Sequence, residues 1–235
     1  MKRILYFFLG LIAFLSLLCS IAVSCVTNAA MMKQGFLQFS QTEHLSVSAS
    51  RYGDYAVALV NYLDGKSDLP RVPAYDGQGG VKEAFSEKEN AHLADVRGIV
   101  NFLKIIRWAG GGLTLLLLLA LYIKHKADPA AFFAEVARSF ALSALFLLLF
   151  ASALAVWGIV NFDGLFVTFH KVAFTNDLWL LNPNADLLLA LMPLPFFTWY
   201  VGEILKSMLP VLGMMLLVII AWLRTDKKQK ETNEP

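Results

Sequence analysis

The chain has very little charge over long stretches. Only 16% of its 235 residues are Asp, Glu, Lys or Arg, whereas 57% are hydrophobic. Soluble domains average about 25% charged and about 45–50% apolar residues. Four apolar runs, at 4–26, 108–123, 139–162 and 207–223, hold no charged side chain at all. Runs of this kind suit the hydrocarbon layer of a bilayer, so the composition excludes an ordinary soluble domain.

Several other chemistries lack the residues that they need. The two cysteines, Cys19 and Cys25, lie in the first apolar run without Cys or His partners at zinc-site spacing. The net charge is only +2, and no Lys/Arg stripe alternates with aromatics as in nucleic-acid-binding domains. A Gly-rich phosphate loop, a His-Glu-x-x-His helix and a Gly-x-Ser-x-Gly turn are all missing. We therefore expect no metal, no cofactor and no nucleic-acid partner.

The positions of the cations predict how the chain crosses the membrane. In the short segments, Lys and Arg gather before the first apolar run, between the second and third, and after the fourth, whereas 163–203 carries only Lys171. The long stretch 27–107 also has several cations, but loops beyond about 60 residues are exempt from the rule that relates cations to topology. By the positive-inside rule, both termini face the cytoplasm. The first run is longer than the roughly 7–15 apolar residues of a cleavable signal, so we expect a retained membrane anchor.

These observations predict a mainly α-helical, polytopic membrane protein that forms a single domain over 1–235. Four transmembrane helices are expected at 4–26, 105–124, 139–162 and 204–223. The parts between and after them are a small mixed α/β extracytoplasmic cap (27–104), a cytoplasmic loop (125–138), an outer interfacial loop (163–203) and a cytoplasmic tail (224–235). The sequence leaves open the fold of the cap, the oligomeric state and whether 187–197 re-enters the bilayer.

Three local patterns fall within the predicted cap. Ser50 precedes an apolar periodicity that predicts a helix over 51–63. Residues 45–49 alternate apolar side chains with Ser, which favours a short strand. Ser86 and Glu89 have the spacing of a capping box, so a second helix should begin there and run toward the second span.

Two of the four histidines lie where a predicted outer loop meets the membrane. His92 and Asp95 share one face of the expected helix, and His170 precedes Asn176 and Asp177. An imidazole has an ordinary pKa of about 6.5, so it can give or take a proton near neutrality, and a carboxylate can fix its tautomer. The residues alone allow a catalytic pair, or two interfacial histidines that bond to backbone carbonyls.

Two stretches resemble the signatures of a known family. Residues 85–96 read FSEKENAHLADV, and residues 169–186 read FHKVAFTNDLWLLNPNAD. Both resemble the bacterial lipoprotein intramolecular transacylase family, Lit, and the order of spans and loops is similar from Lys2 to Arg224. The second signature is long and unusual. The first departs from the family pattern at Lys88, where an Arg is expected, and at Leu93, where a Met is expected.

The resemblance implies an acyltransferase whose partners are membrane lipids and a diacylglyceryl-modified lipoprotein. The family moves the sn-2 acyl chain from the glyceryl group to the α-amino group of the same N-terminal cysteine, which leaves a lyso-form lipoprotein. The family histidines fall on His92 and His170, which we interpret as acid and base on the extracytoplasmic face, with the base assigned to His170. The expected orienting or substrate-binding residues are Asp95, Asn176, Asp177, Trp179, Phe166 and Phe169, of which the aromatic ones could equally be membrane anchors.

Two alternatives use the same features differently. A lipid-ester hydrolase would employ the two histidines with water in place of the amine. A non-enzymatic membrane assembly factor would use the outer cap to bind a partner protein. Acyl-chain preference and lipoprotein selectivity are not encoded in any pattern that we recognise.

Overall fold

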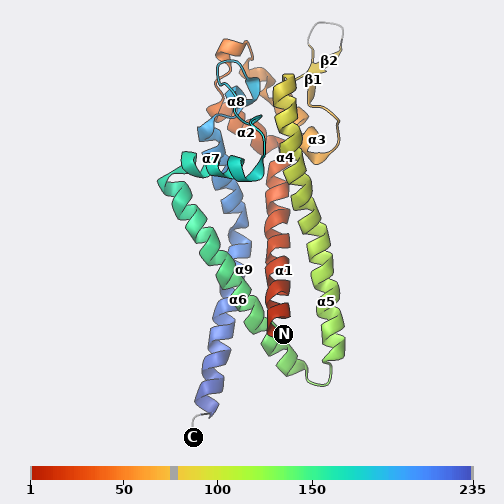
Figure 1. Cartoon of the computed structure of the whole chain (residues 1–235), viewed down its shortest axis with the longest axis vertical. Coiled ribbons are helices and arrows are strands. Elements are labelled where there is room, and N and C mark those ends of the chain that lie inside the picture. Colours follow the sequence, from red (N-terminus) through yellow and green to blue (C-terminus); the bar gives the residue numbers. More distant parts are fainter. Residues whose placement is uncertain (1, 75–78, 234–235) are drawn as a thin grey trace. The chain divides into compact units, whose positions relative to one another are not determined.

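The computed structural model describes residues 2–74 and 79–233, with side chains in the last helix as far as Arg224. Residues 75–78 of the predicted cap and 234–235 of the predicted tail lie outside the described residues. The chain forms two compact units (Figure 1). The four-helix unit holds the residues up to Ile21, Lys104–Ile159 and the residues from Ser207, and the mixed unit holds Ala22–Leu103 and Val160–Lys206.

Four helices among the described residues are long and apolar enough to cross a membrane, as predicted. They cover Lys2–Val26, Glu87–Lys124, Pro129–Val160 and Leu194–Arg224. In terms of elements, these are α1 (Lys2–Val26), α4 (Glu87–Ile105) with the π-helical turn η3 (Ile106–Gly110) and α5 (Gly111–Lys124), α6 (Pro129–Val160), and α9 (Leu194–Asn233). Each of the last three begins well before its apolar run, because helical hydrogen bonding does not stop where hydrophobicity stops.

Small residues bring the helices of the four-helix unit close together. A Cβ atom on Gly10 of α1 would lie 2.7 Å from Ser143 Oγ of α6, and that hydroxyl donates to the Phe7 carbonyl across 2.7 Å. A Cβ atom on Gly110 would lie 2.6 Å from Ser16 Oγ, which donates to the Ile106 carbonyl. Close approach at small residues with hydroxyl bonds to carbonyls is typical of helix packing in lipid. Gly110 therefore combines close packing with the end of the π-helical turn.

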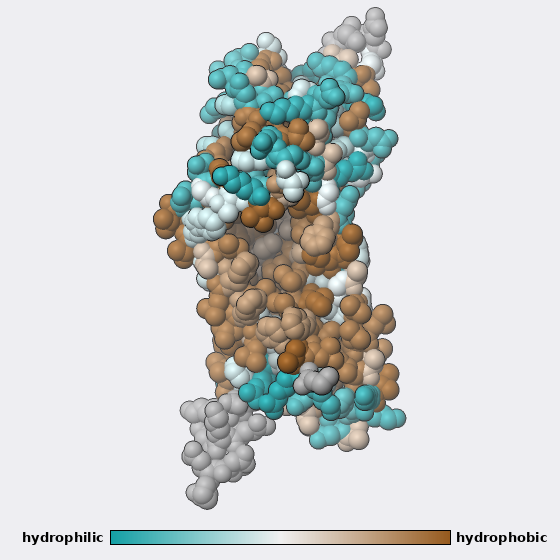
Figure 2. Space-filling model, in the orientation of Figure 1, coloured by the Kyte–Doolittle hydropathy of each residue, from teal (hydrophilic) through white to brown (hydrophobic). Residues whose placement is uncertain are grey.

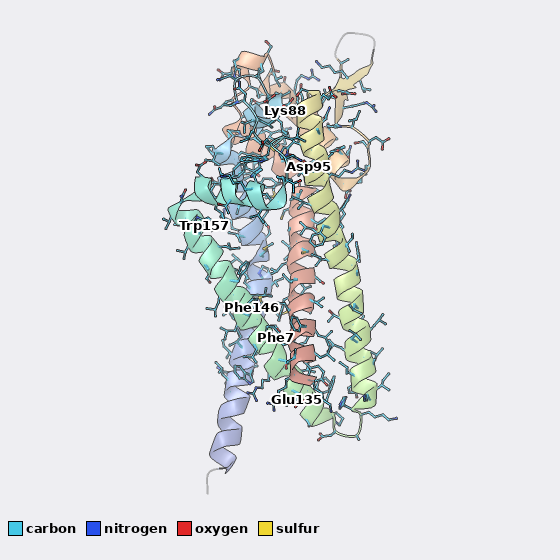
Figure 3. All side chains as sticks on the ribbon, in the orientation of Figure 1. Phe7, Lys88, Asp95, Glu135, Phe146 and Trp157 are labelled. Atoms are coloured by element: carbon cyan, nitrogen blue, oxygen red, sulfur yellow. The ribbon has the colours of Figure 1, made fainter. Side chains whose placement is uncertain are left out.

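The outer surface of the four-helix unit is apolar. Figure 2 shows hydrophobic residues covering its visible face along the helices. Large side chains such as Leu115 and Leu149 are more than half exposed, and Phe146 of α6 points outward beside Phe7 of α1 (Figure 3). A surface of this kind suits lipid tails and would be costly in water.

The mixed unit has a core of its own. Helices α2 (Ala29–Phe39) and α3 (Tyr52–Asp64) pack against each other, and their buried side chains join Leu188, Leu191 and Phe196 in one cluster. The predicted helix at 51–63 is confirmed as α3. It ends at Gly65, whose φ of 85° is a left-handed conformation that favours glycine, and whose N–H bonds back to the helix.

The predicted strand at 45–49 is wrong. Residues Glu43–Leu45 and Ala49–Arg51 form the short 3₁₀ turns η1 and η2 instead. The cause is local, because Ser46 has a left-handed φ of 56° and the Thr42 hydroxyl donates to the Val47 carbonyl across 2.7 Å. The only sheet among the described residues is an antiparallel pair, β1 (Arg71–Pro73) with β2 (Val81–Glu83), in which Val72 pairs with Lys82.

The segment expected as an outer interfacial loop, 163–203, is largely helical. It holds α7 (Phe162–Ala173), the short α8 (Leu187–Leu191) and the first turns of α9. In α7, the polar and apolar residues separate onto different sides, and Phe169 and Val172 stay exposed. Figure 1 shows α7 running crosswise to α4 within the mixed unit. The irregular chain between α7 and α8, residues 174–186, is hereafter called the strap.

Candidate active site

A capping box fixes the start of the helix that carries His92. Glu89 Oε2 accepts a hydrogen bond from the Ser86 N–H across 2.7 Å, and the Glu89 N–H points back to Ser86 Oγ. The sequence predicted this cap. The structure adds a long-range bond, because Glu89 Oε1 accepts from the Leu188 N–H across 2.6 Å. One buried carboxylate therefore ties the start of α4 to the start of α8, one turn before His92.

The second histidine is held by its own helix. Asn161 caps α7 by accepting a hydrogen bond from the Gly164 N–H across 2.8 Å. In the last turn, His170 Nδ1 lies 2.7 Å from the Phe166 carbonyl oxygen. Because a carbonyl can only accept, Nδ1 carries the proton of the neutral ring, and the lone pair is on Nε2.

The two predicted histidines lie close together. Their ring centroids are 6.1 Å apart, although 78 positions separate them in the sequence. Each side chain is 8% exposed. Phe174 contacts both rings, with centroid distances of 5.3 Å to His92 and 5.5 Å to His170. The Phe174 N–H donates to the His170 carbonyl, so the end of α7 holds this aromatic ring against both imidazoles.

Both imidazoles are neutral at neutral pH. Burial lowers the pKa of His92 from 6.5 to about 4; the neighbouring His170 lowers it as well, and Asp95 opposes the shift. Burial also lowers the pKa of His170, against the effect of the Phe166 carbonyl. Charged residues surround His92 in the sequence, so this part of α4 lies before the apolar stretch that begins after Arg107. Nδ1 of His92 is buried without a hydrogen-bond partner among the described residues, a state typical of functional sites.

The strap is fastened to α4 on both sides of His92. Asn176 Nδ2 donates to Asp95 Oδ2 across 2.9 Å, and Lys88 Nζ donates to the Leu180 carbonyl across 2.6 Å. Lys88, His92 and Asp95 follow the i, i+4, i+7 spacing of one helix face. Figure 3 shows Lys88 and Asp95 along the same helix. The two predicted orienting residues, Asp95 from the His92 helix and Asn176 from the segment after His170, thus bond to each other.

The predicted aromatic residues all contact His170. Phe166 is nearest, with a centroid distance of 4.2 Å, followed by Trp179 at 5.0 Å and Phe169 at 5.3 Å. Phe166 also packs on Phe197 of α9. These rings exclude water from the imidazole, which accounts for its lowered pKa. Whether they also hold an acyl chain stays a prediction.

Asp177 is the one predicted residue that stands apart from the histidines. Its side chain is exposed, and no hydrogen bond or ion pair of its carboxylate occurs in the described part of the chain. Sequence reasoning missed three residues that build the site: Phe174, Lys88 and Glu89. The i+4 spacing of Phe174 from His170 was a usable signal, whereas the partners of Lys88 and Glu89 are distant in sequence.

A metal would need more ligands than the pair supplies. Two imidazoles can share a metal ion, but no group of three or more His, Cys, Asp or Glu side chains suited to a metal occurs within 2–74 and 79–233. The arrangement instead offers two neutral imidazoles, one with a defined basic nitrogen, in a nearly dry aromatic cluster. Such a pair can move a proton between two reacting groups.

The sequence matches the family model of the lipoprotein intramolecular transacylase Lit over residues 5–197. The chain belongs to the Lit family. It is therefore an acyltransferase, and its four apolar helices agree with a membrane-integral one. No curated protein matches the sequence.

Solved structures show the same fold. The membrane-integral Lit from Bacillus cereus is similar with a TM-score of 0.66 at 21% identity, covering 98% of each chain. A variant of that protein with a histidine changed to arginine gives a TM-score of 0.58 at 20% identity, covering 99% of this chain and 95% of the other. A variant with a histidine changed to alanine gives a TM-score of 0.58 at 21% identity, covering 98% of this chain and 96% of the other. At 20–21% identity, these similarities show a shared fold and nothing further.

Proposed function

We propose that this Lit protein moves the sn-2 acyl chain of a diacylglyceryl-modified lipoprotein to the α-amino group of the lipoprotein's own N-terminal cysteine. The product is a lyso-form lipoprotein with an N-acylated cysteine. The supporting observation is the meeting of His92 and His170, two neutral, nearly buried imidazoles with centroids 6.1 Å apart. The family supplies the reaction class, and the pair supplies an acid and a base for it.

His170 acts as the base. The cysteine amine attacks the ester carbonyl carbon as a neutral nucleophile and must lose a proton as the new C–N bond forms. Nδ1–H of His170 is committed to the Phe166 carbonyl, so Nε2 is the nitrogen that accepts this proton. The same hydrogen bond stabilises the imidazolium that results, as it does in other histidine bases that are held by an acceptor.

His92 acts as the electrophilic partner. Its lowered pKa, about 4, keeps the ring neutral, so its N–H polarises the ester carbonyl oxygen through a hydrogen bond. When the C–O bond breaks, the proton that His170 took from the amine passes to the glyceryl oxygen, which leaves as an alcohol. One proton leaves nitrogen and one reaches oxygen, and both imidazoles end neutral.

The intramolecular reaction suits a dry site. Donor ester and acceptor amine belong to one molecule, so holding them in contact supplies much of the acceleration. The aromatic rings of Phe166, Phe174 and Trp179 around the imidazoles keep water away from the ester. Transfer to the amine is thereby favoured over hydrolysis.

The site belongs on the extracytoplasmic side, with both termini in the cytoplasm. The support is the distribution of Lys and Arg, which gather before the first apolar run, between the second and third, and after the fourth. A lipoprotein anchored in the outer leaflet presents its cysteine at the same boundary. The mixed unit then forms the cap over the reaction, with residues 27–104 and 163–203 as its two parts.

Mass spectrometry of a lipoprotein N-terminus tests the proposal. The chain and its His92→Ala and His170→Ala variants are expressed in cells that make diacylated lipoproteins. Wild type should move one acyl chain to the amine at constant total lipid mass, and both variants should leave the lipoprotein diacylglyceryl-modified. His125→Ala, in the four-helix unit, is the matched control and should behave as wild type. If wild type removed the mass of one acyl chain from the lipoprotein, the protein would be a hydrolase. If wild type left the lipoprotein unchanged, it would be an assembly factor. Either result contradicts the proposal.

A further inference from the structure

The strap and α7 line an open cavity beside the His170 ring. Its volume is about 640 Å³. Its lining is mixed: Val167, Phe174, Trp179 and Leu180 are apolar, whereas the four polar residues, hereafter the polar edge, are Lys171, Thr175, Asn176 and Asp177. The cavity therefore offers an ammonium, a hydroxyl, an amide and a carboxylate together with hydrophobic side chains.

The charged and hydroxyl groups of the polar edge are not engaged by the protein. No hydrogen bond or ion pair of the Lys171, Thr175 or Asp177 side chain is present in the described part of the chain. Lys171 and Asp177 line the same cavity and yet do not form a salt bridge with each other. The edge thus offers both donors and acceptors, and charges of both signs, to a ligand.

The cavity adjoins the catalytic pair directly. Phe174 and Trp179 form its wall and also contact the His170 ring, at 5.5 Å and 5.0 Å between centroids. Asn176 lines the edge and holds Asp95 on the His92 side. A ligand in the cavity therefore contacts the same two rings that pack on His170.

We infer that this cavity binds the polypeptide that follows the lipidated cysteine, so that the first residues of the lipoprotein lie along Lys171, Thr175 and Asp177. The inference rests on the proposed function and names a subsite for it. When the cysteine amine lies at His170, the cysteine carbonyl must lead the chain away from the pair. The adjoining cavity receives it.

The polar edge distinguishes a peptide from an acyl chain. A hydrocarbon chain in this cavity would desolvate an ammonium and a carboxylate without giving either a partner, which is costly. A peptide supplies an N–H and a C=O at each residue, and these match the acceptors and donors of the edge. Its side chains then meet Lys171 or Asp177, so the charge of the residues after the cysteine affects how well a lipoprotein fits.

Synthetic substrates with one lipid and different tails test the subsite. The purified full chain is given diacylglyceryl-cysteine amide with no following residue, and the same lipid with a neutral, an acidic or a basic tail. Wild type should have a higher kcat/KM for the tailed substrates than for the tail-free one. Lys171→Glu should lower kcat/KM for the acidic tail and raise it for the basic tail, each by roughly two- to fivefold. Asp177→Lys should do the reverse, and the rate of each variant on the tail-free substrate is the reference for these changes.

Two further variants sharpen the comparison. Thr175→Trp places a large ring in the cavity and should slow the tailed substrates while it spares the tail-free one. Lys82→Glu and Asp68→Lys make the same charge changes at exposed positions that do not line the cavity, and should leave the ratio between tails unchanged.

The outcomes separate this subsite from the proposed function. Equal rates on tailed and tail-free substrates would overturn the subsite while transacylation stands, and so would charge reversals that slow every substrate alike. A Thr175→Trp effect that depends on acyl length would assign the cavity to the lipid instead. If wild type transferred the acyl chain in none of the substrates, the proposed function itself would fall.

Discussion

Asn176 donates a hydrogen bond to Asp95 across 2.9 Å and thereby joins the strap to the helix that carries His92. The Asn176 side-chain oxygen also accepts from the Leu178 N–H, so both ends of the amide are used. The Asn176 side chain thus stabilises the turn that follows Phe174. It also holds the Asp95 carboxylate, which raises the pKa of His92 against the effect of burial. The bond links the segment after His170 to the helix that carries His92.

Removing either partner of this bond should slow acyl transfer. We expect Asp95→Ala and Asn176→Ala each to lower the transfer rate by about tenfold, because the strap loosens and the ring of Phe174 loses its position. The double variant should be no slower than the worse single variant, since residues that act as a unit are not additive. Rates are measured on one lipoprotein substrate, with Asp68→Ala as the control. Fully additive losses would contradict the coupling.

Stability should fall with acidity because of His92. Burial lowers the pKa of His92 to about 4, so the unfolded chain takes up a proton below pH 6.5 while the folded chain does not. Above about pH 6.5, the pKa of the histidine in the unfolded chain, the ring is neutral in both states and does not affect stability. As the pH falls from about 6.5 to about 4, the free energy of unfolding decreases progressively. Thermal unfolding of wild type and His92→Gln across this range isolates the contribution, because the carboxylates are common to both. Parallel curves would refute a lowered pKa.

The second tether of the strap can be tested through Lys88. Lys88→Met removes the donor to the Leu180 carbonyl, which lies 2.6 Å away, and should lower kcat/KM by about fivefold, since such a partly exposed bond contributes about 1 kcal/mol. Lys88→Arg retains a donor and should recover most of the activity. Lys82→Met is the control for loss of one exposed lysine. If the Met and Arg variants were equally impaired, the hydrogen bond would not be the reason.

The core of the mixed unit should not tolerate a methyl group on Gly35. A Cβ atom there would lie 2.4 Å from the Phe196 ring, which is fully buried, so the ring must shift. We expect Gly35→Ala to lower the free energy of unfolding by about 1–3 kcal/mol. Gly53→Ala is the matched control, because its Cβ would meet only the flexible side chain of Lys33, 3.7 Å away. Thermal melts of the two variants test this expectation, and equal melting temperatures would contradict the predicted loss of stability in Gly35→Ala.

Reporter fusions test the proposed orientation. A periplasm-active phosphatase should be inactive at the C-terminus, after Arg224, and active when inserted after Gly79 in the predicted cap, whereas a cytoplasmic reporter should give the opposite pattern. The expectation follows from the Lys and Arg residues that flank the apolar runs. Activity of the phosphatase at both points would mean that the topology is wrong.

Local sequence signals predicted the parts of the fold that depend on neighbouring residues. The apolar runs indicated the four long helices, and the Ser86–Glu89 spacing indicated the start of α4, because periodicity and capping act within a few residues. The alternation at 45–49 misled, because the left-handed Ser46 and a Thr42 bond turn the chain there. The alternation of apolar residues with Ser carries no information about a left-handed turn, so it could not predict this bend.

Long-range relationships lay beyond the sequence. Nothing near Glu89 indicates that its second oxygen meets the Leu188 N–H, and nothing near Lys88 indicates the Leu180 carbonyl. The two histidines were identified through their chemistry and the family resemblance, and only the folded chain shows that one ring of Phe174 lies against both. Their catalytic roles stay a prediction until the variants are measured.

The strap serves the imidazoles on one side and the cavity on the other, and Phe174 and Trp179 belong to both. A substitution of either ring that changes which lipoproteins fit the proposed subsite would therefore also disturb the contacts with the His170 ring. Substrate preference and rate would then change together at these two positions, whereas a substitution of Lys171 changes the charge of the cavity.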